Sequence, residues 1–267
     1  MSSSISKVEF VPRTTCPLHD SGPSVNLKFF KSVEDKLTGR SFKIMRCPVC
    51  EVALTDPYPS EKTVKWLYEG RTSLDNYDDP IRGTLMDKLK DFFARKDIRR
   101  LHTLAKGTEI KNVLDFGTGN GRFALASKHV FPECHVDAVD FEPEPPFALC
   151  SVAGIRYLAL ESFQRDLMKY DLIILRYVLE HVHNPVAFMS SMVERLTPDG
   201  VIYIEVPNVE SAYVHYFSKV SNTFSIPYHL FNFNKNSLNM AVQAAGLNCK
   251  ISTRYFEGEN VLVQSQV

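Results

Sequence analysis

Two carboxylates and three alternating glycines are the residues of this sequence whose spacing first indicates a ligand site. Asp115 ends an apolar run, and Gly117, Gly119 and Gly121 follow it at alternate positions. Glycine adopts positive φ readily and has no Cβ, so a ligand can approach the backbone closely. A carboxylate before such a turn repels a pyrophosphate and suits a ligand with a positive charge and hydrogen-bond donors. The pattern predicts a pocket for a polar ligand of nucleoside size.

The spacing of the glycines distinguishes this turn from two kinds of phosphate-binding turn. A P-loop needs Gly-Lys-Ser or Gly-Lys-Thr, and neither occurs here. A dinucleotide fingerprint places its third glycine where this chain has Arg122, and here that glycine comes one residue earlier. A structural turn in another kind of α/β domain is the alternative explanation.

The second carboxylate, Asp140, ends the next apolar run, 25 residues after Asp115 (140 − 115). An acid at this place can accept two hydrogen bonds from a ribose diol, as in other nucleoside-binding sheets. Phe141 follows and can stack on a base. The alternative is a solvated acid in the turn of residues 140–143.

A further titratable pair, Glu180 and His181, follows another apolar run. Histidine titrates near neutral pH, which suits it to act as the base for a hydroxyl or amine nucleophile. We expect Glu180 to orient His181 or to hold a substrate group. A purely positioning role for His181 is the alternative, since positioning alone supplies much of the rate of a group transfer.

Four potential metal ligands, Cys16, His19, Cys47 and Cys50, form two pairs, each with two residues between the ligands. A tight turn at such a pair can direct both side chains at one metal, and Cys3His is a common tetrahedral zinc set. Four protein ligands leave no open position, so we expect a structural zinc ion. Ordinary buried cysteines and a surface histidine are the alternative.

After residue 106, apolar runs alternate with helical stretches, and this pattern predicts the strands and helices that position these groups. This alternation is typical of parallel βαβ units in a doubly wound sheet, whose ligands bind at the carboxyl ends of the strands. The expected strands are residues 112–116, 135–141, 155–160, 170–176, 201–206, 249–256 and 261–264. Residues 196–200 read as a turn before the fifth of these strands.

The chain before this sheet divides into two predicted parts. Residues 1–60 are irregular and proline-rich, with a predicted hairpin formed by residues 25–30 and 41–45. Residues 61–105 read as a helical cap or linker. The expected organisation is a small module over residues 1–60, this cap, and an α/β domain over residues 106–267.

Several motifs together resemble the class I S-adenosylmethionine-dependent methyltransferases. The segment from Asp115 to Gly121 resembles their nucleotide-binding turn, and Val-Leu-Glu-His-Val-x-x-Pro at 178–185 resembles the segment after their fourth strand. Zinc ribbons precede the catalytic domain in some bacterial methyltransferases similar to this chain. The resemblance implies a Rossmann-like doubly wound sheet with a small N-terminal zinc-ribbon-like module.

The resemblance also implies S-adenosylmethionine as cofactor and assigns the site residues. His181, Glu180 and His229 become the candidates for catalysis, with packing as the alternative for His229. The cofactor-binding candidates are Asp115, Gly117, Thr118, Gly119, Asp140, Phe141, Glu161, Arg176 and Tyr177.

The sequence differs from the similar quinone-ring O-methyltransferases at a residue that binds their catalytic metal ion. In those enzymes an earlier acid joins the Glu and His around a metal, and Tyr177 takes that place here. This departure argues against a catalytic magnesium ion.

Composition limits the partners and the location. The chain has 31 Lys and Arg against 31 Asp and Glu, with no basic cluster, which argues against a nucleic-acid partner. No stretch approaches the ~20 apolar residues of a membrane span. Residues 1–7 do not resemble a secretory signal, and six cysteines without one favour a reducing cytoplasm.

The expected function is methyl transfer to oxygen or nitrogen of a small molecule: a sugar, a nucleotide-sugar or a secondary metabolite. The alternative is a non-catalytic module that binds a nucleoside or a partner through a degenerate methyltransferase fold. The sequence gives no prediction of the oligomeric state.

Overall fold

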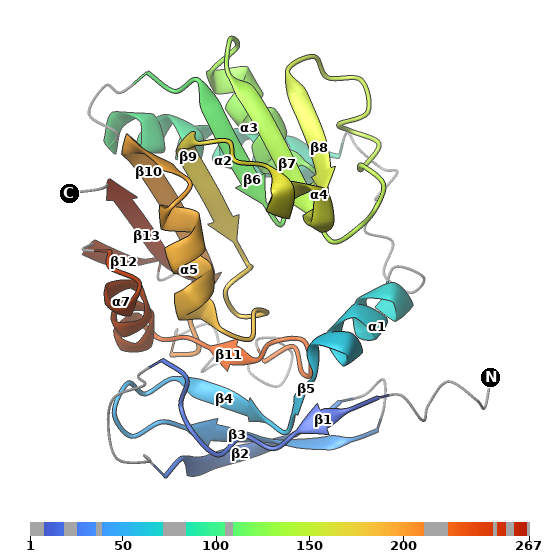
Figure 1. Ribbon diagram of the computed structural model, residues 1–267, viewed down its shortest axis with the longest axis vertical. Helices are drawn as coiled ribbons and strands as arrows, with labels where there is room; N and C mark the ends of the chain where they lie inside the picture. Colours follow the sequence, from blue (N-terminus) through green and yellow to red (C-terminus); the bar gives the residue numbers. More distant parts are fainter. Residues whose placement is uncertain are drawn as a thin grey trace.

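The computed structural model describes residues 8–18, 26–35, 39–71, 84–104, 109–210, 224–247, 250–254 and 259–265. His19, the predicted fourth metal ligand, lies outside these ranges. The described chain forms a large sheet built from its C-terminal part, a smaller sheet below it, and a separate pair of short strands (Figure 1).

The large sheet has seven strands in the order β12-β13-β10-β9-β6-β7-β8. Five neighbouring strands pair in parallel: β6 (Asn112–Phe116), β7 (His135–Asp140), β8 (Ile155–Ala159), β9 (Tyr170–Arg176) and β10 (Leu196–Pro207). β13 (Glu259–Ser265) pairs antiparallel with both β10 and β12 (Lys250–Arg254). The predicted Rossmann-like sheet is confirmed, with an antiparallel strand that the sequence pattern did not predict.

The turn expected at residues 196–200 lies within the bounds of β10, as an irregularity of the strand. Residues 196–200 belong to β10, which pairs with β9 at both Leu196 and Val201. The register shifts between these two residues, so the extra residues bulge out of the ladder and the strand continues.

Helices cover both faces of the large sheet, because side chains of a buried strand alternate between its faces. Leu114 and Ile173 pack in the core beneath α5 and α7, whereas their neighbours Val113 and Leu172 pack in the core beneath α2 and α3. The helices are α1 (Glu61–Arg71), α2 (Leu85–Leu104), α3 (Arg122–Val130), α4 (Leu160–Arg165), α5 (Pro185–Val193) and α7 (Lys235–Ala244). Among the described helices, none combines the length and the apolarity that crossing a membrane requires.

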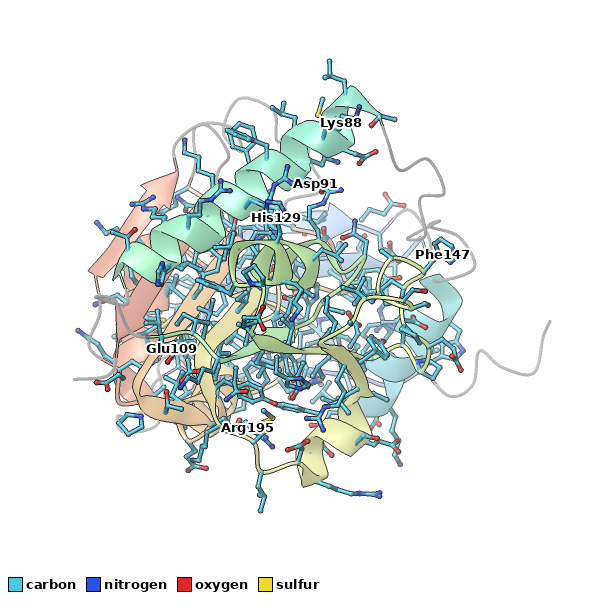
Figure 2. The ribbon with its side chains drawn as sticks, turned by 90° about the horizontal axis from the view of Figure 1, so that it is seen from above. Lys88, Asp91, Glu109, His129, Phe147 and Arg195 are labelled. Atoms are coloured by element: carbon cyan, nitrogen blue, oxygen red, sulfur yellow. The ribbon has the colours of Figure 1, made fainter. Side chains whose placement is uncertain are left out.

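Helix α2 runs across the outside of α3, and Asp91 and His129 line the same hollow between them (Figure 2). Arg122, the first residue of α3, forms ion pairs with Asp87 and Asp91 of α2, each at 3.3 Å. The start of α3 is therefore tied to α2.

The smaller sheet contains the predicted hairpin, formed by β2 (Lys28–Glu34) and β3 (Ser41–Arg46), and then β4 (Ala53–Asp56). Its fourth strand, β11 (Phe231–Asn232), comes from the C-terminal half of the chain and pairs antiparallel with β4. A separate pair joins β1 (Phe10–Val11) to β5 (Tyr58–Pro59). The N-terminal sheet is thus completed by a segment distant in sequence.

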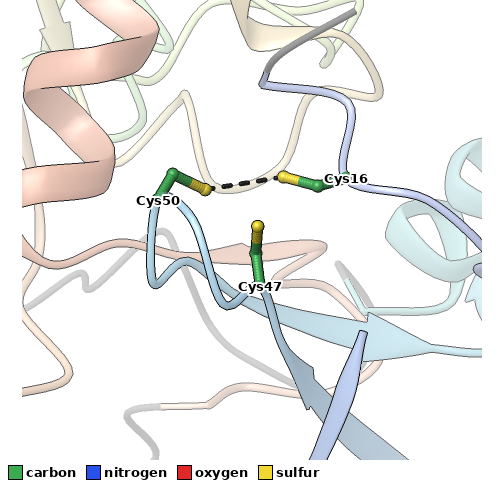
Figure 3. A group of neighbouring side chains, drawn as sticks. All are labelled: Cys16, Cys47 and Cys50. Carbon is green, nitrogen blue, oxygen red and sulfur yellow. Dashed lines mark hydrogen bonds between the residues drawn. The ribbon is translucent and has the colours of Figure 1, made fainter. Parts of the chain in front are cut away.

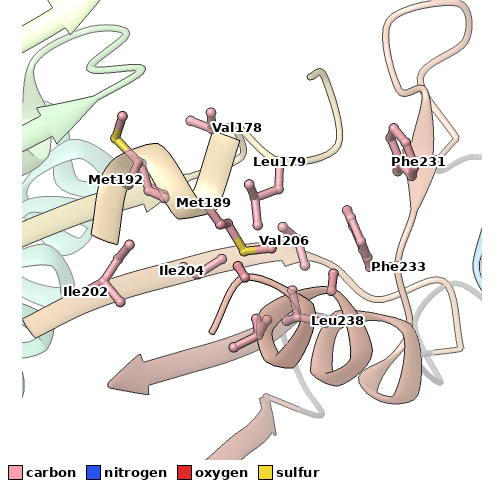
Figure 4. Close-up of a cluster of buried hydrophobic side chains, with 14 of the residues drawn as sticks. Val178, Leu179, Met189, Met192, Ile202, Ile204, Val206, Phe231, Phe233 and Leu238 are labelled. Atoms are coloured by element: carbon pink, nitrogen blue, oxygen red, sulfur yellow. The ribbon is translucent and has the colours of Figure 1, made fainter. Parts of the chain in front are cut away.

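A continuous apolar core connects the two sheets. Phe231 and Phe233 stack with ring centroids 5.8 Å apart, and they lie beside Leu238 of α7 and Met189 of α5 (Figure 4). The same cluster includes Leu54 of β4. Burial of these side chains holds the smaller sheet against the larger one.

A buried acid, Asp137 of β7, joins three strands of the large sheet. Its carboxylate accepts hydrogen bonds from Arg156 Nε and Nη2 and from the Tyr170 hydroxyl, each at 2.7 Å. Burial alone would raise the pKa of Asp137, but the hydrogen bonds from Arg156 and Tyr170 outweigh it and lower the pKa.

We expect Asp137→Asn to lower the free energy of unfolding by about 2–3 kcal/mol, less than for a fully buried pair because Arg156 is partly exposed. Because the folded pKa is depressed, the stabilisation is present above the ordinary pKa and is lost as pH falls through the folded value. Urea unfolding at several pH values measures this, with Glu109→Gln in an exposed ion pair as the control. Equal losses in both variants would contradict the prediction.

Candidate functional site

The glycine turn after β6 is fixed by hydrogen bonds to the neighbouring strand. The amides of Gly117 and Thr118 donate to the carbonyl of Val139, at 2.8 and 3.0 Å. Gly117 has φ +73°, and a Cβ there would lie 2.7 Å from Val178 Cγ2. Gly121 has φ +77° and caps the start of α3. The conformation and the close approach of Val178 both require glycine at 117.

Asp115 lies under this turn and braces it. The side chain is 3% exposed, and Oδ2 accepts hydrogen bonds from Thr118 Oγ1 at 2.7 Å and from the Ala124 amide at 2.9 Å. Burial raises the pKa of Asp115 to about 6, against the opposing effect of these hydrogen bonds. Asp115 thus connects the strand, the turn and the first turn of α3.

Asp140 meets the same turn from the end of β7. Its Oδ2 accepts a hydrogen bond from the Gly119 amide at 2.7 Å, and its Oδ1 accepts one from the Phe141 amide at 2.7 Å. The negative charge of Asp140 contributes to the raised pKa of Asp115. Phe141 is 54% exposed beside them.

Arg176, at the end of β9, is held by a carboxylate that the sequence analysis did not single out. Arg176 Nε donates to Glu205 Oε2 at 2.5 Å, and the Tyr203 hydroxyl donates to the same oxygen at 2.7 Å. Its guanidinium lies over the Phe123 ring at 4.1 Å. The sequence could have indicated Glu205, because it is the one charged residue in the apolar run of residues 201–206.

Tyr177 follows Arg176 with φ +54°, and its amide donates to the Glu205 carbonyl at 2.8 Å. Its side chain is 37% exposed. Glu161 differs from the other cofactor-binding candidates, because it is exposed in the first turn of α4 and none of the described hydrogen bonds joins it to the glycine turn.

The three predicted catalytic residues lie together. One ligand atom each of Glu180, His181 and His229 lies within 4.8 Å of the others. The two imidazole rings meet edge to face at a centroid distance of 4.8 Å. The backbone assembles the group, because the amides of Leu230 and Phe231 both donate to the Glu180 carbonyl, at 2.7 and 3.2 Å.

Glu180 is the most unusual side chain of this group. It is 1% exposed, and neither carboxylate oxygen has a hydrogen-bond partner within the described parts of the chain. Burial raises the pKa of Glu180 to about 8. A neutral carboxyl group at pH 7 can donate a proton or a hydrogen bond.

His181 has a defined tautomer in this arrangement. Its Nδ1 lies 3.0 Å from the Tyr228 carbonyl oxygen. Since a carbonyl only accepts, Nδ1 carries the proton, and Nε2 is the basic nitrogen of the neutral ring. The group of Glu180, His181 and His229 can therefore exchange protons, and its donor atoms are also of the kind that a divalent cation binds.

Three of the predicted metal ligands, Cys16, Cys47 and Cys50, converge on one point beside the smaller sheet (Figure 3). The Sγ atoms of Cys16, Cys47 and Cys50 lie within 4.8 Å of one another, and all three side chains are buried. The Sγ atoms of Cys16 and Cys50 are 3.5 Å apart, which is too far for a disulfide. The three thiols thus form three corners of a possible tetrahedral site.

The sheet order and the turn between β6 and α3 define a Rossmann-like α/β protein. Residues 82–250, more than half of the chain, match the family described as "Methyltransferase domain". The chain therefore belongs to that family.

Among curated proteins, the chain is similar to "Methyltransferase str3" of Strobilurus tenacellus, with 30% identity over 36% of this chain and 35% of the relative. It is also similar to the ubiquinone biosynthesis O-methyltransferase of Rickettsia bellii, with 27% identity over 54% of this chain and 57% of the relative. The matched part spans between a third and just over half of these relatives' lengths.

Among solved structures, the chain resembles the 1,6-didemethyltoxoflavin-N1-methyltransferase of Burkholderia thailandensis, which was crystallised with 1,6-didemethyltoxoflavin and S-adenosylhomocysteine. The TM-score is 0.55 at 18% identity, and the match covers 90% of this chain and 99% of the other. At this identity the likeness supports the fold.

We expect Glu180→Gln to change the pH dependence of stability. The folded pKa is about 8 and the ordinary value 4.5, so between these values the folded state keeps a proton that the unfolded state has lost. The stability of the wild type then falls as pH rises through this window, and the variant lacks this loss. Within this window, the free energy of unfolding of the variant relative to that of the wild type should rise by up to about 1.4 kcal/mol per pH unit.

Urea unfolding at pH 5, 6.5 and 8, without added divalent cations, measures this difference. Glu161→Gln, at an exposed position, is the control and should follow the wild type. Parallel curves for Glu180→Gln and the wild type would show that Glu180 ionises normally in the folded protein.

Proposed function

We propose that this protein is an S-adenosylmethionine-dependent methyltransferase that acts on oxygen or nitrogen of a small molecule. The observation that carries the proposal is the pair of acids, Asp115 and Asp140, on one glycine turn at the carboxyl edge of the sheet. Membership of the methyltransferase domain family agrees with it. Glu180 and His181 of the proton-exchanging group follow β9, the strand next to β6, and His229 joins them from the segment before β11.

The residues of the turn fit this cofactor. The Cβ side of Gly117 is filled by Val178, but Gly119 has no Cβ and a positive φ, so a ligand can lie against the main chain there. We assign Asp140 to the ribose diol, Phe141 to the adenine, and Asp115 with Thr118 to the base of the site. Arg176, Tyr177 and, more distantly, Glu161 complete the proposed set. When bound, the cofactor supplies a methyl group on a sulfonium centre.

In the proposed reaction the protein positions the acceptor and takes up its proton. His181 Nε2 accepts the proton from a hydroxyl or protonated amine of the acceptor, while Nδ1 stays bonded to the Tyr228 carbonyl. Glu180, neutral at pH 7, donates a hydrogen bond or holds a polar group of the acceptor. His229 packs against His181 and limits its orientation.

The class of acceptor is a proposal from the relatives' names and from the charge of the chain. Names of related proteins mention O-methyl and N1-methyl transfer to small molecules. A sugar, a nucleotide-sugar or a secondary metabolite fits a chain with a formal net charge of +0 better than a nucleic acid does.

We also propose a structural zinc ion, held in a ribbon-like N-terminal module by Cys16, Cys47, Cys50 and His19. Three converging thiols support this, and a fourth protein ligand would close the site. A site that needs reduced thiols favours a cytoplasmic location.

S-adenosylhomocysteine binding tests the proposed function. We expect the wild type to bind it in calorimetry, and Asp140→Ala to bind it about ten- to a hundredfold more weakly, because a charged acceptor for two hydroxyls is lost. Asp199→Ala, at an exposed position on β10, is the matched control and should bind normally. If the wild type does not bind at millimolar concentration, a non-catalytic module is the better description.

Metal analysis tests the zinc site. The purified chain should contain about one zinc ion per molecule. We expect Cys50→Ser and His19→Ala to reduce this content, and Cys150→Ser, at an exposed cysteine, to leave it unchanged. A wild-type protein purified without zinc chelators and still free of zinc would refute the assignment.

A further inference from the structure

Arg13 is a cation enclosed between the N-terminal segment and the C-terminal half of the chain. Its guanidinium carbon lies 4.1 Å from the centre of the Tyr58 ring and 5.1 Å from that of Phe231. Its amide donates to Asp56 Oδ1 at 2.8 Å, which fixes the backbone beside β4. Burial lowers the pKa of Arg13 to about 10, so the group remains charged at neutral pH.

On one edge of this guanidinium, two N–H donors make no hydrogen bond to the described residues. Nε and Nη2 are shielded from solvent, and neither has a hydrogen-bond partner among the residues that the structure describes. The N–H groups of this edge are parallel, which is the geometry that a carboxylate or phosphate takes with two oxygens.

Two other arginines show what normally fills this edge. Arg156 places Nε and Nη2 against the two carboxylate oxygens of Asp137, both at 2.7 Å. Arg176 places the same two nitrogens against Glu205, at 2.5 and 3.3 Å. Arg13 is enclosed in a similar way, and the charge of Asp56 acts on it, but no carboxylate of the described residues accepts a hydrogen bond from its Nε or Nη2.

Short contacts connect Arg13 to the candidate catalytic group. The Tyr58 ring, under the guanidinium, meets the His183 ring at 5.8 Å, and His183 Nε2 donates to the Pro59 carbonyl at 2.8 Å. On the other side, the amide of Phe231 donates to the Glu180 carbonyl. Arg13 therefore borders the segments that carry Glu180, His181 and His229.

We propose that Arg13 binds an anionic group of the methyl acceptor, a carboxylate or a phosphate, through its Nε and Nη2 edge. The acceptor would then lie between the N-terminal segment, which holds its anion, and the turn after β9, which faces its nucleophile. The identification of the ligand as an acceptor rests on the proposed methyl transfer, but the anion site can be tested without it.

The contacts favour a planar or tetrahedral oxyanion over a neutral ligand. A stacked guanidinium keeps its charge against the Tyr58 ring, but stacking satisfies none of its N–H groups. Because Nε and Nη2 are covered in this structure, an anion reaches them only when the covering side chains move aside. Once there, it is held more strongly than at the surface, since water is excluded.

The test uses the full chain as purified, with benzoate and phenyl phosphate as probes and benzamide as the neutral control. Calorimetry gives the affinities, and the NMR signal of the Arg13 Nε–H reports the contact directly. Arg13→Met keeps the apolar stem, and Arg13→Lys keeps the charge without the two-pronged edge. Arg40→Met is the matched control, because Arg40 is exposed and stacks on Phe10 in the same region.

We expect at least one anion to bind the wild type and shift the Arg13 signal, and benzamide to do neither. Both Arg13 variants should lose about tenfold or more in anion affinity, and Arg40→Met should lose none. Equal binding to the wild type and the Arg13 variants, equal binding of benzamide, or no anion binding would each overturn the proposal. If Arg13→Met does not fold, Arg13→Lys alone decides.

S-adenosylhomocysteine affinity, measured on the same samples, separates the two proposals. It should be unchanged in both Arg13 variants, because Arg13 contacts Tyr58 and Phe231 rather than the glycine turn. Anion binding that depends on Arg13 in a protein without S-adenosylhomocysteine binding would leave the anion site standing and reject the methyltransferase function.

Discussion

The hydrogen bonds from Gly117 and Thr118 to the Val139 carbonyl are the constraint on which the candidate site depends. They hold the end of β6 against the end of β7, so that Asp115 and Asp140 meet the same turn from two sides. Because Asp115 also bonds the Ala124 amide, the start of α3 is fixed by the same acid. A ligand at this edge meets a preformed backbone surface.

The segment before β11 holds the second half of the site in place. The Glu180 carbonyl accepts hydrogen bonds from the amides of Leu230 and Phe231. The Thr55 hydroxyl of β4 donates a hydrogen bond to the His229 carbonyl at 2.6 Å. Glu180 and His229 are therefore fixed between the large sheet and the small one. This bracing keeps a carboxyl group buried without partners for its oxygens, an arrangement that an unbraced loop would relax by turning the acid to water.

The features that the sequence predicted correctly are those that depend on local patterns. Apolar runs bounded by turns located the parallel strands, and the spacing of the glycines located the turn after β6. The pairing of β11 with β4 joins residues far apart in the chain, and two-residue strands have no periodicity to detect. The Arg176–Glu205 pair and the enclosure of Arg13 likewise depend on which segments meet after folding. At residues 197–200 the chain bulges out of the β9–β10 ladder, because only Leu196 and Val201 on either side of them pair with β9.

The place of β11 in the smaller sheet has a consequence for how the chain folds. A strand contributed from residue 231 onward cannot pair with β4 until most of the polypeptide has been synthesised, so the N-terminal sheet is completed late. A fragment that starts after β5 would leave the backbone of β11 and the faces of Phe231 and Phe233 without cover, as an edge open to association with other chains. The two sheets thus share one apolar core and one connecting segment, and recombining the N-terminal part with another catalytic domain would require transfer of β11 as well.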